Sequence, residues 1–541
     1  MNSIVKIPTA KNEPVLPFAP GDAATLSLKN KLQELKGTEV DIPMYIGGEE
    51  VFTDEKISMH PPHEIAHNLG IYNKGNASHV QQAIDSALAA KESWANMPWE
   101  SRAAIFLKAA DLLAGPFRDK MNAATMLAQS KNAMQAEIDA ACEMIDFFKF
   151  NVQYMSEIYR QQPPENSPGV WNQLEYRPLE GFVFALTPFN FTSICANLCA
   201  APAMMGNTVV WKPAETQIYS AQVIMELFQE AGLPDGVINL VYVDGPTTGE
   251  VVFNHRDFAG IHFTGSTGVF RHIWKTIGNN ISNYRSYPRV VGETGGKDFV
   301  MVHPSANVDQ VSTALVRGSF EFQGQKCSAA SRAYIPKSMW PALKPKVVET
   351  TNSLRMGATE DFSNFINAVI DKKAFDKISS FIADAKAASD AEVIAGGEYD
   401  DSIGYFVRPT IIETENPKYT TMCEEIFGPV LTIYVYEDDK YEETLDLVDS
   451  TSEYALTGAI FAKERNDINT ALNKLRNAAG NFYVNDKPTG AVVGQQPFGG
   501  ARGSGTNDKA GAAINLMRWT SMRTIKENFG APKSYEYPFH S

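Results

Sequence analysis

The sequence predicts an α/β protein in which parallel β-sheets are covered by helices. Short apolar strands alternate with helices from 182 to 263, and the same alternation returns from 300 to 482. This pattern favours parallel sheets packed on both faces. A chain of 541 residues is long enough for about two to four domains, and it contains no internal repeat. We therefore expect two α/β domains with smaller appended parts.

The N-terminal part of the chain is predicted to be mainly helical. Residues 1–39 read as an irregular arm that ends in a short charged helix. Helical spacing of apolar residues from 78 to 114 is interrupted near Pro98, which predicts two helices. A third helix is predicted as one long element from about 120 to 159.

The clearest break in the chain is a proline-rich stretch at 161–169. Strands are predicted on either side of it, at 170–176 and 182–187, so a projecting hairpin is expected. The tail at 517–525 also reads as a strand. The uncharged run at 181–211 is punctuated by Pro, Gly and Asn, which is typical of a buried α/β core and not of a membrane span.

The elements within the two alternating regions follow from apolar runs between turn residues. The first region predicts helices from about 193 and 219 and strands at 208–211, 237–242 and 260–263. The second predicts a helix at 374–387 and strands at 406–412 and 430–436.

Composition excludes several classes of protein. A net charge of −15 lacks the basic face that a nucleic-acid surface needs. The five cysteines are sparse and form no CxxC pair, which is typical of a reducing compartment. The histidines show no metal-binding spacing, so no metal site is expected. The N-terminus lacks a signal peptide, so a cytoplasmic location is expected, with the mitochondrial matrix after presequence removal as the alternative.

The candidate nucleophile is Cys327, which lies between a glycine-containing approach and small residues. A thiolate forms more easily near a cation or a helix N-terminus. Lys326 is the nearest cation, and a helical turn is predicted to begin at Ser328. The alternative, a buried apolar cysteine, stays open on this stretch alone.

Two other polar residues are candidates for catalysis. Glu293 stands beside a Gly-Gly pair, where a carboxylate can swing towards a site as a general base. The alternative is a solvated turn residue. Asn190 follows a strand, where its amide could stabilise an oxyanion or simply cap a helix. The run at 292–297 is not a phosphate loop, because Asp298 stands where Ser or Thr is required.

A dinucleotide site is predicted beyond the first set of strands. Lys212 and Glu215 follow one strand, at the edge of a parallel sheet where dinucleotides bind. Gly265 and Ser266 follow another, and backbone N–H groups at a helix start bind pyrophosphate. The spacing does not match GxGxxG, so the glycine turn is a weak signal by itself.

Taken together, these stretches resemble the aldehyde dehydrogenase family, and the resemblance covers nearly everything after residue 40. Six motifs occur in the family's order: FNF at 189–191, WKPAE at 211–215, FTGS at 263–266, ETGGK at 293–297, GQKC at 324–327 and EEIFGPV at 424–430. Finer features resemble the branch that oxidises L-glutamate γ-semialdehyde, in equilibrium with 1-pyrroline-5-carboxylate, to L-glutamate in proline degradation. These features lie at 136–141, 147–151, 327–329 and 489–502.

The resemblance also implies an aldehyde dehydrogenase-like fold and the way in which it is divided into domains. A Rossmann-like NAD domain, an α/β catalytic domain and a small β oligomerisation flap would join protomers into a homodimer or larger homo-oligomer. The implied bounds are 40–159 and 181–293 for the NAD domain, 294–485 for the catalytic domain, 160–180 and 515–541 for the flap, and 1–39 for the arm.

The implied mechanism is NAD-dependent oxidation through a cysteine thioester. Cys327 attacks the aldehyde, Asn190 and the Cys327 N–H hold the oxyanion, and Glu293 activates water. For NAD, Lys212 and Glu215 would hold the adenosine ribose, and Glu425 and Phe427 the nicotinamide end. The Glu215 carboxylate would repel a 2′-phosphate, so NAD is expected in preference to NADP.

For the substrate, the resemblance implies that Glu137 meets the amino group. The implied α-carboxylate site is Ser328 with Gly490 and Ala491, and the implied aromatic walls are Phe191 and Phe498. A serine is often found where Ala491 stands, so one carboxylate contact is in doubt.

Three other functions are alternatives to this one. One is an aldehyde dehydrogenase for another semialdehyde. Another is a non-redox cysteine acyl hydrolase, which has no need for Lys212 and Glu215. The third is a binding homologue, which would be expected to lose Cys327 or Glu293. The expected partner is a small-molecule substrate, without nucleic acid or membrane.

Overall fold

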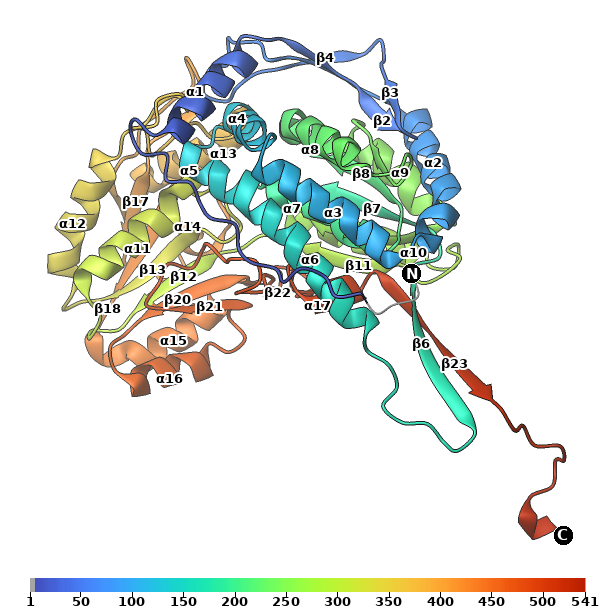
Figure 1. Cartoon of the computed structure of the whole chain (residues 1–541). Helices are drawn as coiled ribbons and strands as arrows, with labels where there is room; N and C mark the ends of the chain where they lie inside the picture. Colours follow the sequence, from blue (N-terminus) through green and yellow to red (C-terminus); the bar gives the residue numbers. More distant parts are fainter. Residues whose placement is uncertain (1–4, 541) are drawn as a thin grey trace.

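Two seven-stranded sheets form the body of the protein (Figure 1). The structure is a computed structural model that describes residues 5–540. The first sheet contains β2 (Met44–Ile46), β3 (Glu49–Val51), β7 (Phe182–Thr187), β8 (Val209–Pro213), β9 (Ile238–Leu240), β10 (Phe258–Thr264) and β11 (Arg289–Glu293). Its strand order is β11-β10-β7-β8-β9-β2-β3.

The order of the parallel strands creates a site for a ligand. Five neighbouring strands, β11, β10, β7, β8 and β9, run parallel to one another. The chain begins this set in the middle with β7, moves outward through β8 and β9, and then returns to the other side of β7 as β10. Ligands of open α/β sheets bind beyond the carboxyl ends of the strands at such a reversal point. The ends of β7 and β10 are therefore the expected position of a cofactor.

Helices cover both faces of this sheet (Figure 1). They include α2 (Ala77–Asn96), α3 (Trp99–Ala114), α7 (Thr192–Met204), α8 (Ile218–Ala231), α9 (Gly245–Asn254) and α10 (Thr267–Asn279). The predicted break near Pro98 is confirmed, because α2 ends and α3 begins on either side of it. Phe106 of α3, Phe148 and Phe228 of α8 contact one another in the core. Burying each such ring contributes about 1.5–3 kcal/mol.

The single helix predicted at 120–159 was wrong. The structure has α4 (Arg118–Gln129), α5 (Ala133–Ala136), a π-helical segment η1 (Glu137–Glu143) and α6 (Met144–Tyr159). Ser130 ends α4 in the left-handed conformation, with φ of 55°. Its hydroxyl accepts a hydrogen bond from Ala368 N–H (3.2 Å) and lies 3.0 Å from His63 Nδ1. Contacts distant in sequence therefore stabilise a break that local helical spacing does not reveal.

The second sheet is parallel except at one edge. It contains β12 (Asp298–Val302), β13 (Ala330–Pro336), β14 (Ala391–Ala395), β17 (Thr410–Thr414), β18 (Val430–Tyr436), β20 (Thr457–Phe461) and β21 (Asn481–Val484). The order is β14-β17-β18-β13-β12-β20-β21, and only β14 is antiparallel to its neighbour. Helices α11 (Val308–Phe320), α12 (Trp340–Ser353), α13 (Lys372–Ala387), α15 (Tyr441–Ser450) and α16 (Arg465–Lys474) cover it.

The strand predicted at 406–412 is divided in the structure. Its first part, β16 (Phe406–Val407), pairs with β15 (Tyr399–Asp400), and β17 begins only at Thr410. Pro409 lies between the two parts. Proline has no N–H to donate, so it interrupts a continuous ladder.

A two-stranded ribbon projects from the body (Figure 1). It pairs β6 (Val170–Pro178) with β23 (Thr520–Asn528) in antiparallel register along the whole length of both strands. The hairpin predicted between 170–176 and 182–187 is not formed, because β7 joins the first sheet and β6 pairs with the C-terminal strand. Trp171 and Met522 of the ribbon and Phe529 beyond it are more than half exposed.

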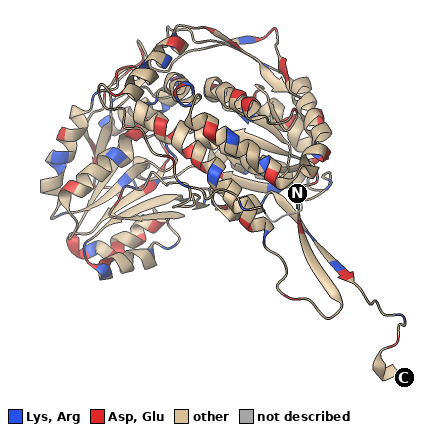
Figure 2. Cartoon of the chain, viewed as in Figure 1, with Lys and Arg blue, Asp and Glu red and all other residues tan. Residues whose placement is uncertain are grey.

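Charged residues of both signs are distributed over the fold. Acidic and basic residues are interspersed along the chain in Figure 2. Within residues 5–540, no helix is long and apolar enough to cross a membrane. Over the same residues, no group of three or more His, Cys, Asp and Glu side chains is placed to hold a metal ion.

Candidate active site

A cavity containing Cys327 lies where the two α/β parts meet. It has about 820 Å³ of empty space, part of it open to solvent. One wall comes from η1 and the start of α6, through Asp139, Glu143 and Phe147. The opposite wall is the loop 489–498, which follows the last strand of the second sheet. The cavity can therefore admit a small organic substrate to a thiol.

Cys327 is placed by an unusual turn just before β13. Phe322 and Gln323 have positive φ angles of 51° and 53°. The Ala329 N–H donates to Lys326 O (3.0 Å), which closes one turn around the cysteine. The helical turn predicted from Ser328 is not formed, because β13 begins at Ala330. The loop conformation, rather than a helix N-terminus, directs the thiol to the cavity.

The Cys327 thiol is in an environment that favours its protonated form. Burial, with the nearby negative charge of Glu293 and Asp298, raises the pKa of Cys327 well above its usual range. Lys326 does not offset this effect, because its ammonium is ion-paired with Glu321 at 3.2 Å. The thiol must therefore lose its proton during the reaction.

Glu293 ends β11 and faces a smaller cavity of about 450 Å³. This second cavity shares Glu143, Phe147 and Phe498 with the cavity around Cys327. Burial raises the pKa of the Glu293 carboxyl to about 8, although the Lys509 ammonium opposes the shift. A group that titrates near neutral pH is suited to general-base catalysis.

Asn190 follows β7 and is buried next to the cysteine loop. Its side-chain Nδ2 donates to the Gln325 carbonyl at 3.1 Å. The amide carries a second N–H that this bond does not use. Asn190 thus connects the first sheet to the loop that carries Cys327.

The predicted cofactor residues lie at the carboxyl ends of strands. Lys212 is the last residue but one of β8; burial lowers the pKa of its ammonium, which donates to Pro213 O at 3.1 Å. Glu215 is exposed beyond it. After β10, Gly265 precedes Ser266, whose hydroxyl caps α10. A Cβ built on Gly268, in the first turn of α10, meets nothing within 4 Å, so space for a ligand is present there.

Glu425 and Phe427 approach from the second sheet. Glu425 Oε1 accepts from Gly296 N–H at 2.8 Å, and burial raises the pKa of its carboxyl. Phe427 has a positive φ of 61°, and its ring lies edge-on to Phe189, with centroids 5.9 Å apart. Both line a small cavity with Gly296 and Lys326. This arrangement connects the loop before β18 to the Cys327 loop.

Most of the predicted substrate residues line the Cys327 cavity. The Ser328 and Thr489 hydroxyls lie 2.9 Å apart. Gly490, with φ of 97°, and Ala491 follow on the same loop. Phe191 and Phe498 provide aromatic walls, and Lys131 lies over the Phe191 ring at 4.5 Å.

Glu137, the predicted partner of the substrate amino group, does not line this cavity. It is fully buried, and its carboxylate forms an ion pair with Arg118. Asn122 Nδ2 (2.7 Å) and the Leu16 N–H (2.9 Å) also donate to it. These partners satisfy the carboxylate within the protein, which corrects the role expected from the sequence.

Sequence reasoning missed Glu143, which lines both cavities. Its Oε2 accepts from the Ser193 hydroxyl at 3.0 Å. Burial and the neighbouring Asp139 raise the pKa of the Glu143 carboxyl to about 8. One signal was present: Glu143 stands four residues before Phe147, so the two share a helical face.

Asp139, another carboxylate of the cavity wall, already has strong partners. It is ion-paired with Lys131, and it accepts hydrogen bonds from the N–H groups of Thr192 and Ser193 at the start of α7. Of the two η1 carboxylates at the cavity, Glu143 is thus the one available to a cationic ligand.

Comparison with known proteins agrees with this geometry. Residues 52–525 match the aldehyde dehydrogenase family. The chain is 53% identical over 535 residues to "Delta-1-pyrroline-5-carboxylate dehydrogenase, mitochondrial" of Dictyostelium discoideum, covering 98% of this chain and 96% of that protein. The human protein of the same name is 47% identical, with 98% and 94% covered. A crystal structure of the Delta-pyrroline-5-carboxylate dehydrogenase from Mycobacterium tuberculosis bound with NAD has a TM-score of 0.96 and 52% identity, over 100% of both chains.

Proposed function

The chain belongs to the aldehyde dehydrogenase family, and on that premise we propose that it oxidises L-glutamate γ-semialdehyde to L-glutamate with NAD. The substrate is in equilibrium with 1-pyrroline-5-carboxylate, and the reaction is the second step of proline catabolism. One observation carries the substrate assignment: the Cys327 cavity is lined both by Glu143, which has no ion-pair partner among residues 5–540, and by the hydroxyl and backbone groups of Ser328 and the 490–491 loop. An α-amino acid head group requires both kinds of partner.

The chemistry begins at the Cys327 sulfur, which attacks the aldehyde carbon. The thiol proton has to pass to solvent in the partly open cavity as the C–S bond forms, because the environment of Cys327 keeps the free thiol protonated. The second Asn190 amide N–H and the Cys327 backbone N–H are proposed to hold the developing oxyanion. When bound, NAD accepts the hydride that leaves the substrate carbon. Glu293 then takes a proton from the water that hydrolyses the Cys327 thioester, which releases glutamate.

The residues present fit a dinucleotide. Lys212 and Glu215 offer a cation and an anion beyond β8, suited to ribose hydroxyls, and the first turn of α10 has space for a pyrophosphate. Gly265 and Ser266 lead into that turn. Glu425 and Phe427 are proposed to bind the nicotinamide end. The Glu215 carboxylate would repel a 2′-phosphate, which favours NAD over NADP.

For the substrate, we assign the α-ammonium group to Glu143 instead of Glu137. The α-carboxylate is assigned to Ser328 and the backbone of Gly490 and Ala491. Phe191 and Phe498 are proposed to flank the aliphatic chain between these ends. Ala491 offers no hydroxyl, so its backbone N–H alone serves the carboxylate there.

The test is to follow NADH absorbance with a panel of aldehydes. L-Glutamate γ-semialdehyde should be preferred over an aldehyde of similar length that lacks the amino group. Preference for another semialdehyde would contradict the substrate assignment. Ester or thioester hydrolysis without any NADH formation would indicate a non-redox acyl hydrolase.

The assembly and compartment are also proposals. The exposed Trp171 and Met522 of the ribbon favour association into a homodimer or larger homo-oligomer, which light scattering of the purified protein would measure. For the compartment we propose the cytoplasm, with the mitochondrial matrix as the alternative that cell fractionation distinguishes. The printed name of the Dictyostelium protein includes "mitochondrial".

A further inference from the structure

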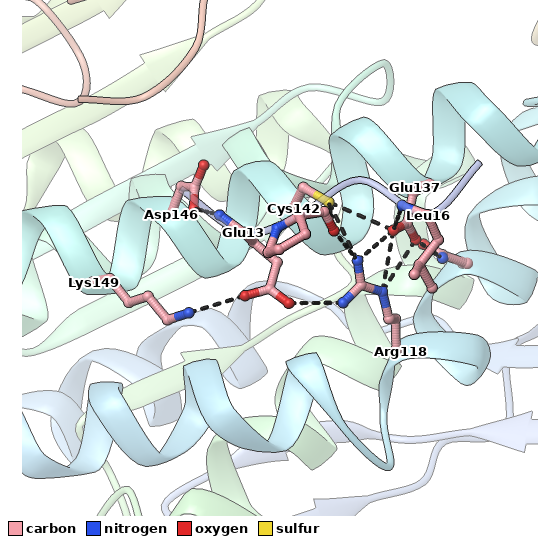
Figure 3. A network of polar contacts seen from close by, with 9 residues as sticks. Glu13, Leu16, Arg118, Glu137, Cys142, Asp146 and Lys149 are labelled. Atoms are coloured by element: carbon pink, nitrogen blue, oxygen red, sulfur yellow. Dashed lines mark hydrogen bonds and ion pairs between the residues drawn. The ribbon is translucent and has the colours of Figure 1, made fainter. Parts of the chain in front are cut away.

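The N-terminal segment 10–16 is attached to the helices that form one wall of the cavity. The Ala10 N–H donates to Gln153 Oε1 at 3.1 Å on α6. The Glu13 N–H donates to Asp146 Oδ1 (2.7 Å). Figure 3 shows the backbone N–H groups of Glu13 and Leu16 directed towards the carboxylates of Asp146 and Glu137, respectively. The segment is thereby held along η1 and α6.

A buried ion-pair network fixes the position of this segment (Figure 3). Arg118 donates to Glu13 Oε1 and to the Pro14 carbonyl, both at 2.8 Å, besides its ion pair with Glu137. Lys149 donates to Glu13 Oε2 at 3.0 Å. Removing one partner from a buried pair leaves an uncompensated charge, so each contact constrains the others. Glu137 therefore anchors the N-terminal segment through Arg118.

Asn12 extends from this segment to both walls of the cavity. Its Nδ2 donates to Asp146 Oδ2 and to the Val493 carbonyl, both at 2.7 Å. Its Oδ1 accepts from Gln495 Nε2 at 2.9 Å. A primary amide has two N–H donors and one carbonyl acceptor, so these contacts use each of its polar atoms.

The two groups that Asn12 joins belong to opposite sides of the substrate site. Asp146 lies three residues after Glu143 on the same helical wall. Val493 belongs to the loop 489–496, whose Gly490, Ala491 and Val493 line the cavity. The loop lies between β21 and β22 (Ala501–Arg502), where its backbone has no sheet partner to hold it. A loop without such a ladder depends on side-chain contacts for its position.

We propose that the N-terminal segment 10–16 is part of the substrate-binding site, with Asn12 as a positioning residue that sets the separation between Glu143 and the 489–496 loop. This inference rests on the proposed function, which assigns these two walls to the ammonium and carboxylate ends of the substrate. A rigid separation favours an α-amino acid head group, because its two charges are only three bonds apart. An aldehyde without these groups does not use that separation.

The first test is Asn12→Ala. Loss of the hydrogen bond to the charged Asp146 should raise KM for L-glutamate γ-semialdehyde by about ten- to a hundredfold, since such bonds contribute roughly 1.5–3 kcal/mol and 1.4 kcal/mol is tenfold. The kcat and the KM for NAD should stay within about twofold of wild type, because Cys327 and the cofactor residues are not contacted. Butanal, which lacks both charged groups, should be oxidised by Asn12→Ala as it is by wild type.

The second test is Asn12→Asp, which replaces a donor to Asp146 with a second carboxylate. At pH 8 its KM should exceed that of Asn12→Ala, because like charges repel. As the pH falls towards 6, one proton shared by the introduced carboxylate and Asp146 should restore the hydrogen bond between them. The ratio of the KM of Asn12→Asp to the KM of wild type at the same pH should therefore fall. The pKa of Asp146, raised by burial to about 6, places this change in an accessible range. Charged or titratable groups around Asp146 are Glu13, Lys149, Cys142 and Glu143.

A matched control is Asn416→Ala. Asn416 Nδ2 also donates to an aspartate, Asp390 Oδ2 at 3.0 Å, but this pair is exposed and contacts neither cavity. This variant should keep the wild-type KM. Hydrogen exchange on the full-length protein adds an activity-independent measurement: amides of 489–496 should exchange faster in Asn12→Ala, with β12 and β13 unchanged.

The outcomes separate this inference from the proposed function. If wild type fails to oxidise L-glutamate γ-semialdehyde, the proposed function falls, while hydrogen exchange still tests the Asn12 contact. If wild type is active and Asn12→Ala keeps both its KM and its loop protection, the inference is overturned. An equal loss of kcat with both aldehydes would also overturn it, because that pattern indicates general destabilisation of the fold.

Discussion

Replacing Glu143 by glutamine tests the substrate assignment most directly. The change keeps the shape of the side chain and removes its charge. A charge-assisted hydrogen bond to the substrate ammonium group contributes about 1.5–3 kcal/mol. With a pKa of about 8, the free carboxyl is mostly protonated at pH 7, and ionising it there costs about 1.4 kcal/mol. The expected net loss is therefore about 0–1.6 kcal/mol at pH 7, or up to about fifteenfold in kcat/KM.

The same reasoning predicts how the loss depends on pH. At pH 9 the carboxylate is already ionised, so the ratio of wild-type to Glu143→Gln kcat/KM should rise to roughly ten- to a hundredfold or slightly more. Taking the ratio at each pH cancels the titration of Glu293, which both proteins share. The assay is NADH formation between pH 7 and pH 9 with L-glutamate γ-semialdehyde, and with an amine-free aldehyde as the control. A ratio that stays flat with pH, or equal losses on both substrates, would refute the assignment of Glu143.

The other predictions concern the chemistry and the cofactor. Cys327→Ala should abolish aldehyde oxidation yet leave NAD binding by calorimetry unchanged; substantial residual turnover would exclude a thioester mechanism. Glu293→Gln should slow thioester hydrolysis more than acylation, so rapid mixing should show a burst of NADH before a slow steady rate. Equal slowing of both phases would assign Glu293 another role. Glu215→Ser should increase activity with NADP by removing a charge that faces the 2′-phosphate, and an unchanged NAD/NADP ratio would place the ribose elsewhere.

The sequence was most informative where function requires particular residues at the ends of regular elements. The motifs after β7, β8 and β10 are short-range patterns, and the strands and turns that carry them are specified by neighbouring residues. The family resemblance then predicted the division into an NAD domain, a catalytic domain and a flap, and it favoured Cys327 as the nucleophile. These features need no knowledge of contacts distant in sequence.

Helix geometry explains why the sequence pointed to Glu137, although Glu143 is the glutamate that lines the cavity. Glu137 and Glu143 bracket a π-helical segment, in which the 3.6-residue spacing of an ordinary helix no longer predicts the facing side. The segment turns Glu143 towards the cavity, and it leaves Glu137 facing Arg118. The partner of Glu137 comes from α4, and its second donor, Leu16, comes from the N-terminal segment. Neither contact is visible in the local sequence.

The partner of the ribbon strand β6 likewise cannot be read from the local sequence around it. The stretch at 170–176 has the composition of a strand, so its existence was predictable. The local pattern pointed to the adjacent β7 as its partner, whereas the family resemblance grouped 160–180 with 515–541 in one flap, and β6 does pair with β23. Pairing between neighbouring strands is the usual outcome, and here the central sheet takes β7 instead.

The pairing of β6 with β23 also sets an order of events during synthesis. Pro178 pairs with Thr520, so the ribosome must add roughly 340 residues after β6 before its partner exists, which takes about 20–70 s at 5–20 residues per second. Throughout that interval β6 is an open strand edge, the kind of surface that pairs with other chains. A nascent chain can complete the first sheet and the N-terminal helices in that time, but not the ribbon. If protomers associate through the ribbon as proposed, that association has to follow synthesis of β23, and a prematurely terminated chain exposes β6 without the strand that covers it.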